Sequence, residues 1–367
     1  MTATLDLLIV DSIAGVQEAV AEGGRLLPRG GGTKPATGAP PGAAAMLDLK
    51  RLTGILEYEP GEYVFTALAG TPLAEIQAEL ATHGQYLPFD PPLVEAGATL
   101  GGTIAAGLSG SGRQRYGGLR DFLIGARFVD GQGRLVRSGG KVVKNAAGFD
   151  LHKLLIGSLG RLAVLVEASF KVFPQPPAYA TLRLQPASIE AALALMARLG
   201  AAKFDLEAID IVANDAGNPH LLLRLGGLET TLLARMNAMS EWIGRGEILR
   251  GDEEARLWRE TREFGWLPNH WQLAKAPVTP EQIPALERWL AARGAATRYI
   301  SAGNLAWIGW PGGWEELSEG LRTLRLGAVT IVGTPGSLWL GTPGNMAMIA
   351  RMKQALDPAG HFLDFAA

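Results

Sequence analysis

The 367-residue sequence contains no cysteine. This excludes disulfide bonds, a thiol nucleophile, cysteine-ligated iron–sulfur clusters and thiolate zinc sites. Charged residues make up only 19% and the formal net charge is -2, so nothing indicates binding to nucleic acid or to an anionic membrane. The chain also lacks a run of about twenty apolar residues and a basic N-terminal region followed by an apolar run. We therefore expect neither a membrane span nor a signal peptide.

Glycine, in contrast, is abundant, with 48 residues. Three stretches are rich in it: residues 29–34 (RGGGTK), 99–103 (TLGGT) and 157–160 (GSLG). Glycine lets a backbone approach a bulky ligand, and successive free N–H groups form concavities that suit phosphate oxygens. Each stretch alone is also typical of an ordinary turn or of close helix packing. Together they predict a long ligand contacted at several points, such as a dinucleotide.

The first stretch fits neither of the two common phosphate-binding motifs. No Gly-Lys-Ser/Thr follows at Walker spacing, and no clean G-x-G-x-x-G opens a helix. Pro35 also stands where the helix of a Rossmann unit would continue. A different dinucleotide-binding fold is therefore indicated.

Five motifs in order resemble the vanillyl-alcohol oxidase/p-cresol methylhydroxylase (PCMH-type) flavoproteins. They are GGGT at 30–33, TLGGT at 99–103, DFLIGARFVD at 121–130, KNAAGFD at 144–150 and GSLGRL at 157–162. Within that family the chain resembles the E-type FAD-binding subunits of bacterial glycolate oxidases, over about residues 10–175. The resemblance implies an α+β fold: a two-subdomain FAD-binding domain at 1–175, a smaller α+β cap domain at 176–335, and a C-terminal helical segment at 336–367 that returns to the FAD-binding domain.

The same resemblance implies which residues contact FAD. The first stretch would wrap the diphosphate, and the second would form a further wall around the diphosphate and the flavin. Gly160, Val164 and Leu165 would pass beside the flavin or the adenosine. The cations Arg29, Lys34 and Arg115 would balance the diphosphate charge. Arg115 fits a solvated surface equally well. No histidine lies near the first stretch, so we expect non-covalent FAD. The implied contacts are Arg29, Gly30, Gly31, Gly32, Thr33, Lys34, Thr99, Gly101, Gly102, Thr103, Arg115, Gly148, Asp150, Gly160, Val164 and Leu165.

The C-terminal half begins after a proline-rich break at 174–177, typical of a domain boundary. Hydrophobic periodicity then predicts alternating strands and helices, as in an α+β cap domain. The expected strands are 181–184, 221–225, 270–274 and 305–310, and the expected helices are 188–199, 230–243, 252–264, 280–293 and 345–356.

The substrate machinery of the family's hydroxy-acid dehydrogenases is not recognisable. Their His-x-Gly-Asp-Gly-Asn-x-His metal-binding stretch compares with YISAGNLAW at 299–307, where Ser301 and Ala306 stand in place of ligands. No other histidine pair has metal-binding spacing, so no metal is expected and no catalytic residue is assigned.

The favoured interpretation is an accessory redox subunit. The resemblance implies a cytoplasmic FAD protein that works with a catalytic flavin subunit and an iron–sulfur subunit. Together they would form a glycolate oxidase complex that oxidises a small 2-hydroxy acid. The partner subunits would bring the chain to the inner membrane. One alternative is a self-sufficient FAD oxidase or dehydrogenase of a small hydroxy acid or alcohol, with Arg113 or Arg262 binding its carboxylate. Another is a structural subunit with a vestigial flavin fold, which the intact glycine stretches disfavour.

Overall fold

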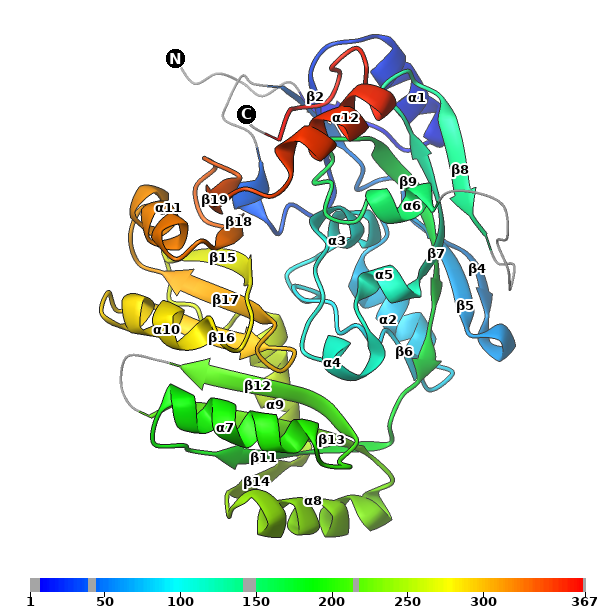
Figure 1. The fold of residues 1–367 in the computed structure, drawn as a ribbon. Helices are drawn as coiled ribbons and strands as arrows, with labels where there is room; N and C mark the ends of the chain where they lie inside the picture. The colour runs from blue at the N-terminus through cyan, green and yellow to red at the C-terminus, as the bar shows by residue number, and fades with distance from the viewer. Residues whose placement is uncertain (1–6, 39–43, 141–149, 214–217, 366–367) are drawn as a thin grey trace. The chain divides into compact units, whose positions relative to one another are not determined.

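The computed structural model describes residues 7–38, 44–140, 150–213 and 218–365 (Figure 1). The chain forms two compact units. Unit 1 comprises residues 1–109, 117–174 and 345–367, and unit 2 comprises residues 110–116 and 175–344. Along the described ranges no helix is both long and apolar enough to cross a membrane.

The described residues of unit 1 form three sheets. A parallel sheet has the order β1-β3-β2, an antiparallel sheet has the order β4-β5-β9-β7-β8, and β6 pairs with β10. Their bounds are β1 Leu7–Ile9, β2 Leu26–Arg29, β3 Ala45–Asp48, β4 Ile55–Glu59, β5 Val64–Leu68, β6 Gln85–Tyr86, β7 Leu123–Val129, β8 Leu135–Gly139, β9 Val164–Lys171 and β10 Phe173–Pro174.

The helices of unit 1 cover these sheets and enclose an apolar core. Val16 and Val20 are fully buried and pack in one cluster with Leu47 and Val164. The C-terminal helix, red in Figure 1, lies beside the N-terminal elements, where the Leu26 N–H donates to the His361 carbonyl at 2.7 Å. The helices are α1 Ile13–Ala21, α2 Leu73–Ala81, α3 Leu100–Ala106, α5 Leu119–Phe122, α6 Leu151–Leu154 and α12 Met346–Leu356, with 3₁₀ turns at Pro35–Thr37 and Pro60–Glu62.

Unit 2 is built on one nine-stranded sheet in which every pairing is antiparallel. Its order is β14-β11-β13-β12-β16-β17-β15-β18-β19. The bounds are β11 Ala178–Leu184, β12 Leu206–Ala213, β13 His220–Gly227, β14 Glu247–Arg250, β15 Gln272–Pro277, β16 Ala296–Ile300, β17 Leu305–Trp310, β18 Gly327–Val332 and β19 Trp339–Gly341.

Helices pack on both faces of this sheet. Arg298 of β16 donates to Thr261 near the end of α9, whereas its neighbour Tyr299 points to the opposite face and donates to Glu287 of α10. In Figure 1, α7 lies in front of the sheet and α9 behind it. The helices are α4 Arg113–Tyr116, α7 Ile189–Gly200, α8 Glu229–Ile243, α9 Gly251–Arg262, α10 Ile283–Ala291 and α11 Trp314–Thr323.

The expected elements of the C-terminal half differ from the structure at some positions. The strand expected at 270–274 starts two residues later, because His270 has a φ of 69° and ends a turn. The strand β12 was not expected, since Glu207 and Asp210 interrupt its apolar pattern. Their partners come from the segment 110–116: Tyr116 donates to Glu207 at 3.1 Å, and Ser111 donates to Asp210.

Candidate functional site

The first glycine stretch follows β2 and runs against the start of the second. A Cβ atom on Gly30 would lie 2.0 Å from Thr99 Oγ1, and one on Gly31 would lie 1.9 Å from the Gly97 carbonyl oxygen. No side chain fits at such distances. Packing within the protein itself therefore requires glycine at these two positions, in agreement with the alternative of close packing that the sequence left open.

The second glycine stretch is fixed by its own hydrogen bonds. Thr99 is the N-cap of α3, and its hydroxyl accepts from the Gly102 N–H at 3.3 Å. The Gly101 N–H donates to the Ala69 carbonyl at 2.7 Å, and a Cβ on Gly101 would lie 2.7 Å from the Ala69 Cβ. This stretch is thus held between the first stretch and the end of β5.

The third glycine stretch packs against the other two. The Gly157 N–H donates to the Ile104 carbonyl at 3.1 Å, and the Leu159 N–H donates to the Ala105 carbonyl at 2.8 Å. Gly160 has a φ of 73°, and a Cβ there would lie 3.2 Å from Pro28, the residue before Arg29. The structure therefore brings together three stretches that are far apart in sequence.

Two polar groups on these stretches could still bind a ligand: one could form an ion pair and the other a hydrogen bond that no described residue provides. The Lys34 ammonium is partly buried and donates to the Thr33 hydroxyl at 2.8 Å, and none of the described carboxylates forms an ion pair with it. Burial lowers the pKa of Lys34 to about 8. The Thr103 hydroxyl is buried and has no hydrogen-bond partner within the described part of the chain. A partly buried cation without an acidic partner and a buried hydroxyl without a hydrogen-bond partner, both among the described residues, fit an anionic ligand with several acceptor oxygens.

The other expected cofactor residues are placed differently. Arg29 is exposed and folds over Gly32, donating to the Met46 sulfur at 3.0 Å. Arg115 lies in unit 2, where it donates to the Asp205 carbonyl at 2.9 Å and lies 3.6 Å from Glu207.

The remaining expected contacts lie on β9 and on the segment before α6. The Val164 side chain belongs to the apolar core, and Leu165 is buried one residue further along β9. Gly148 lies outside the described residues. Asp150 is exposed and forms an ion pair with Lys153 at 2.7 Å.

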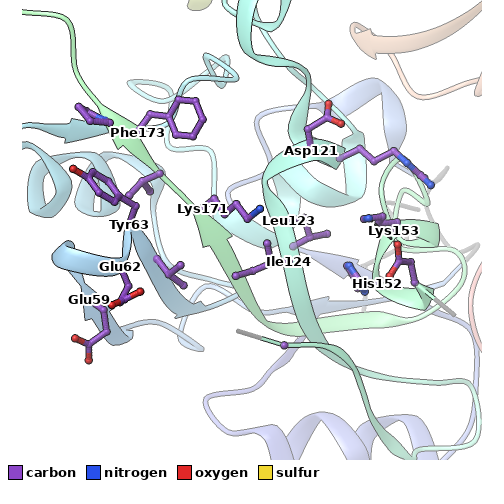
Figure 2. Close-up of a pocket in the computed structure, with 16 residues that line it drawn as sticks. Glu59, Glu62, Tyr63, Asp121, Leu123, Ile124, His152, Lys153, Lys171 and Phe173 are labelled. Atoms are coloured by element: carbon purple, nitrogen blue, oxygen red, sulfur yellow. Dashed lines mark hydrogen bonds and ion pairs between the residues drawn. The ribbon is translucent and has the colours of Figure 1, made fainter. Parts of the chain in front are cut away.

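Asp150 and Lys153 line a hollow of unit 1 that is about 930 Å³ in volume (Figure 2). Leu123 and Ile124 contribute apolar surface to it, and Figure 2 shows Lys171 projecting beside them. His152 at its wall is buried, and this desolvation lowers its pKa. None of the residues that line this hollow comes from the three glycine stretches.

The two positions expected to replace metal ligands lie at the junction of β16 and β17. Ser301 has a φ of 56° in the turn between these strands, and its carbonyl accepts from the Asn304 side chain at 2.9 Å. Ala306 is buried within β17 opposite Tyr299. Among the residues with described positions, no group of three or more His, Cys, Asp or Glu side chains has the geometry to hold a metal ion.

The packing of the first stretch makes a testable prediction. Gly31→Ala should lower the free energy of unfolding of FAD-free protein by about 1–3 kcal/mol, because the new methyl group overlaps a backbone carbonyl that cannot move away freely. Urea denaturation measures the effect. Gly61→Ala is the matched control, since no atom lies within 4 Å of its Cβ position. Equal stability of Gly31→Ala and wild type would contradict the close approach.

Comparisons with known proteins give consistent results. Residues 10–139 match the family described as "FAD binding domain". The chain is 37% identical over 249 residues to glycolate oxidase subunit GlcE of Escherichia coli (strain K12), covering 68% of this chain and 66% of that protein. It is 32% identical over 179 residues to glycolate oxidase subunit GlcD of Bacillus subtilis (strain 168), covering 48% and 38% respectively. The chain thus aligns with no more than about two thirds of the length of either relative.

A solved structure shares the fold. The "alkyldihydroxyacetonephosphate synthase in P212121" structure matches with a TM-score of 0.71 at 15% identity, covering 97% of this chain and 76% of that chain. At this identity the match concerns the fold alone. It confirms the expected α+β class.

Proposed function

The chain belongs to the PCMH-type family of FAD-binding oxidoreductases, and we propose that it is the FAD-binding subunit of a glycolate oxidase or dehydrogenase complex. The observation that carries the proposal is the close packing of three glycine stretches, two of which carry a polar group suited to an anion: the Lys34 ammonium, without an acidic partner among the described residues, and the buried Thr103 hydroxyl, without a hydrogen-bond partner among them. The similarity to a glycolate oxidase subunit supports the choice of complex.

The residues that would hold FAD follow from that arrangement. Lys34 would neutralise diphosphate charge, Thr103 would donate its hydroxyl hydrogen, and the backbone of residues 30–33 would line the diphosphate. FAD supplies a two-electron acceptor for oxidation of a hydroxy acid. No histidine stands within residues 29–34, which supports non-covalent binding. We assign residues 1–175 to the FAD-binding domain and 176–335 to the cap domain. The returning segment was expected at 336–367; because β19 belongs to the sheet of unit 2, we assign only residues 345–367 to it.

The partners follow from what this chain cannot supply. Without cysteine it cannot hold a cysteine-ligated iron–sulfur cluster, so a one-electron relay of that kind would belong to another subunit. Ser301 and Ala306 offer no imidazole at the compared metal-binding stretch. We therefore assign oxidation of the 2-hydroxy acid to a catalytic flavin subunit, and electron transfer to this chain together with an iron–sulfur subunit. The complex would lie in the cytoplasm at the inner membrane.

An anaerobic absorbance spectrum tests this assignment. The FAD-loaded chain should keep its flavin bands when glycolate is added, because the substrate is oxidised on another subunit. The bands should bleach once the catalytic and iron–sulfur subunits are also present. Bleaching by glycolate with this chain alone would contradict the accessory role and would favour a self-sufficient dehydrogenase.

The low pKa of Lys34 predicts that FAD affinity depends on pH. The free ammonium loses its proton near pH 8, whereas a bound diphosphate would favour the charged form and raise that pKa. Binding therefore takes up a proton above about pH 8, and the affinity should fall there by up to about tenfold per pH unit. Below that pH the affinity should be constant.

Fluorescence titrations between about pH 6.5 and about pH 9.5 measure this profile. Lys34→Met is the matched control and should remove the bend. In FAD-free protein, burial holds the pKa of Lys34 below the ordinary lysine value of 10.5. The unfolded chain therefore binds more protons between these two pKa values, and the free energy of unfolding should rise as the pH rises through this window. A flat wild-type affinity profile would exclude Lys34 from the diphosphate site.

A further inference from the structure

A single buried guanidinium connects three separate segments of unit 1. Arg161 is 1% exposed. Its Nε donates to the Asp364 carbonyl at 3.1 Å, and its Nη1 donates to the Leu159 carbonyl at 3.0 Å. Both Nη atoms also lie 3.3 Å from the Thr37 carbonyl oxygen. The side chain thus joins the third glycine stretch, the C-terminal segment and the 3₁₀ turn that follows the first glycine stretch.

The 3₁₀ turn passes this connection on to Lys34. Thr37 donates to the Lys34 carbonyl twice, through its hydroxyl at 2.8 Å and through its N–H at 3.2 Å. Arg161 therefore holds the carbonyl of Thr37, and Thr37 holds the carbonyl of Lys34. The position of the Lys34 backbone, and with it that of the ammonium, depends on these successive hydrogen bonds.

The charge of Arg161 is unusual as well. None of the described carboxylates pairs with it, and its four hydrogen bonds all go to carbonyl oxygens. Burial lowers its pKa to about 10, so it remains protonated near neutral pH. A neutral side chain of similar length would donate to fewer of these carbonyl oxygens. Its burial would not incur the cost of desolvating a charge. The guanidinium therefore supplies two things at this place, a fork of donors for three carbonyls and a buried positive charge that no described carboxylate offsets.

A second buried cation fixes the far side of the connection. The Lys353 ammonium of α12 donates to the Arg161 carbonyl at 2.9 Å and to the Phe362 carbonyl at 2.7 Å. It also forms an ion pair with Asp357. The backbone of Arg161 is thereby attached to the C-terminal segment, which its side chain contacts again at Asp364.

We propose that Arg161 is a positioning residue of the diphosphate site: it holds the Lys34 segment through Thr37, makes the C-terminal segment 357–364 part of that site, and adds fixed positive charge behind the first glycine stretch. The proposal rests on the proposed function, because the anion concerned is the diphosphate of FAD. In this proposal Arg161 acts through Thr37 and the C-terminal segment, since its hydrogen bonds all go to protein carbonyls.

The test compares FAD binding by wild type, Arg161→Met and Arg161→Lys, all in the full chain and well below their unfolding temperatures. Loss of hydrogen bonds to a charged group should weaken FAD binding by about tenfold or more in Arg161→Met. Arg161→Lys keeps the charge without the planar fork, so its Kd should lie between those of the other two proteins. Arg127→Met removes a partly exposed ion pair with Glu167 and should leave the Kd unchanged.

Competition by inorganic diphosphate separates positioning from general destabilisation. Inorganic diphosphate should displace FAD from wild type and should be a much poorer competitor in Arg161→Met, whereas a purely structural role would leave this competition intact. Thr37→Val removes only the hydroxyl bond to the Lys34 carbonyl and should weaken FAD binding by about threefold to tenfold. It decides the matter if Arg161→Met does not fold.

The outcomes are distinguishable. Wild type that binds FAD, together with Thr37→Val and Arg161→Met that bind FAD and inorganic diphosphate equally well, would overturn this inference and leave the proposed function standing. Wild type that binds no FAD would overturn the proposed function and this inference with it.

Discussion

A Lys34→Met chain is expected to bind FAD about 10–100-fold more weakly than wild type at pH 7, yet to be at least as stable without FAD. A charge-assisted hydrogen bond to a diphosphate contributes about 1.5–3 kcal/mol, and the methionine side chain cannot make it. In the FAD-free protein the same substitution removes a desolvated ammonium with no acidic partner among the described residues. Affinity and stability should therefore move in opposite directions.

Fluorescence titration gives the affinity, and urea denaturation of the FAD-free chain gives the stability. Lys50→Met is the matched control, because Lys50 is exposed and pairs with Asp48 at 3.4 Å. Exposed ion pairs contribute about 0–1 kcal/mol, so this control should change neither quantity appreciably. If Lys34→Met lost stability and kept its FAD affinity, Lys34 would be a structural residue.

Asp357→Ala should lower the free energy of unfolding by about 3–5 kcal/mol, the largest stability effect we expect. Asp357 is 2% exposed and accepts from the His361 N–H at 2.8 Å and the Phe362 N–H at 2.9 Å. It is also the ion-pair partner of Lys353. Its removal leaves a buried ammonium without a carboxylate and frees the backbone that closes the C-terminal segment.

Urea denaturation at pH 7 measures this loss. Asp357→Asn keeps an acceptor oxygen and the side-chain volume while removing the charge, so its loss should be smaller than that of alanine. Arg127→Met, which breaks a partly exposed ion pair, should cost at most about 1 kcal/mol. An alanine variant as stable as this control would show that the C-terminal segment is held by its apolar contacts alone.

The three glycine stretches could be recognised from the sequence alone, because a backbone that another group approaches closely needs glycine. It could not separate approach by a ligand from approach by the protein itself. Gly30 and Gly31 are required by Thr99 and Gly97, which lie almost seventy residues away in sequence. Lys34, in contrast, was predicted as a cofactor residue from its place in the motif, and it stays a prediction. The structure adds that its ammonium forms no ion pair with a described carboxylate.

Other site residues depend on partners that sequence does not reveal. Arg161 was not singled out because its partners are backbone carbonyls, which any residue can supply. Arg115 was predicted beside the cofactor from its charge, but Glu207 of β12 accounts for that charge in unit 2. One sequence signal for this pairing existed: Glu207 and Asp210 stand in a strand that is otherwise apolar. Buried charges need partners, so these two carboxylates indicate a nearby cation.

A titration of FAD into the purified FAD-free chain at pH 7, performed in parallel with wild type and Lys34→Met, tests the central claim most directly. The account predicts saturable 1:1 binding by wild type, release of all FAD on denaturation, and an affinity at least about tenfold lower for the variant. Failure of wild type to bind FAD, or equal affinity of the two chains, would contradict the claim that the three glycine stretches and Lys34 form the FAD site.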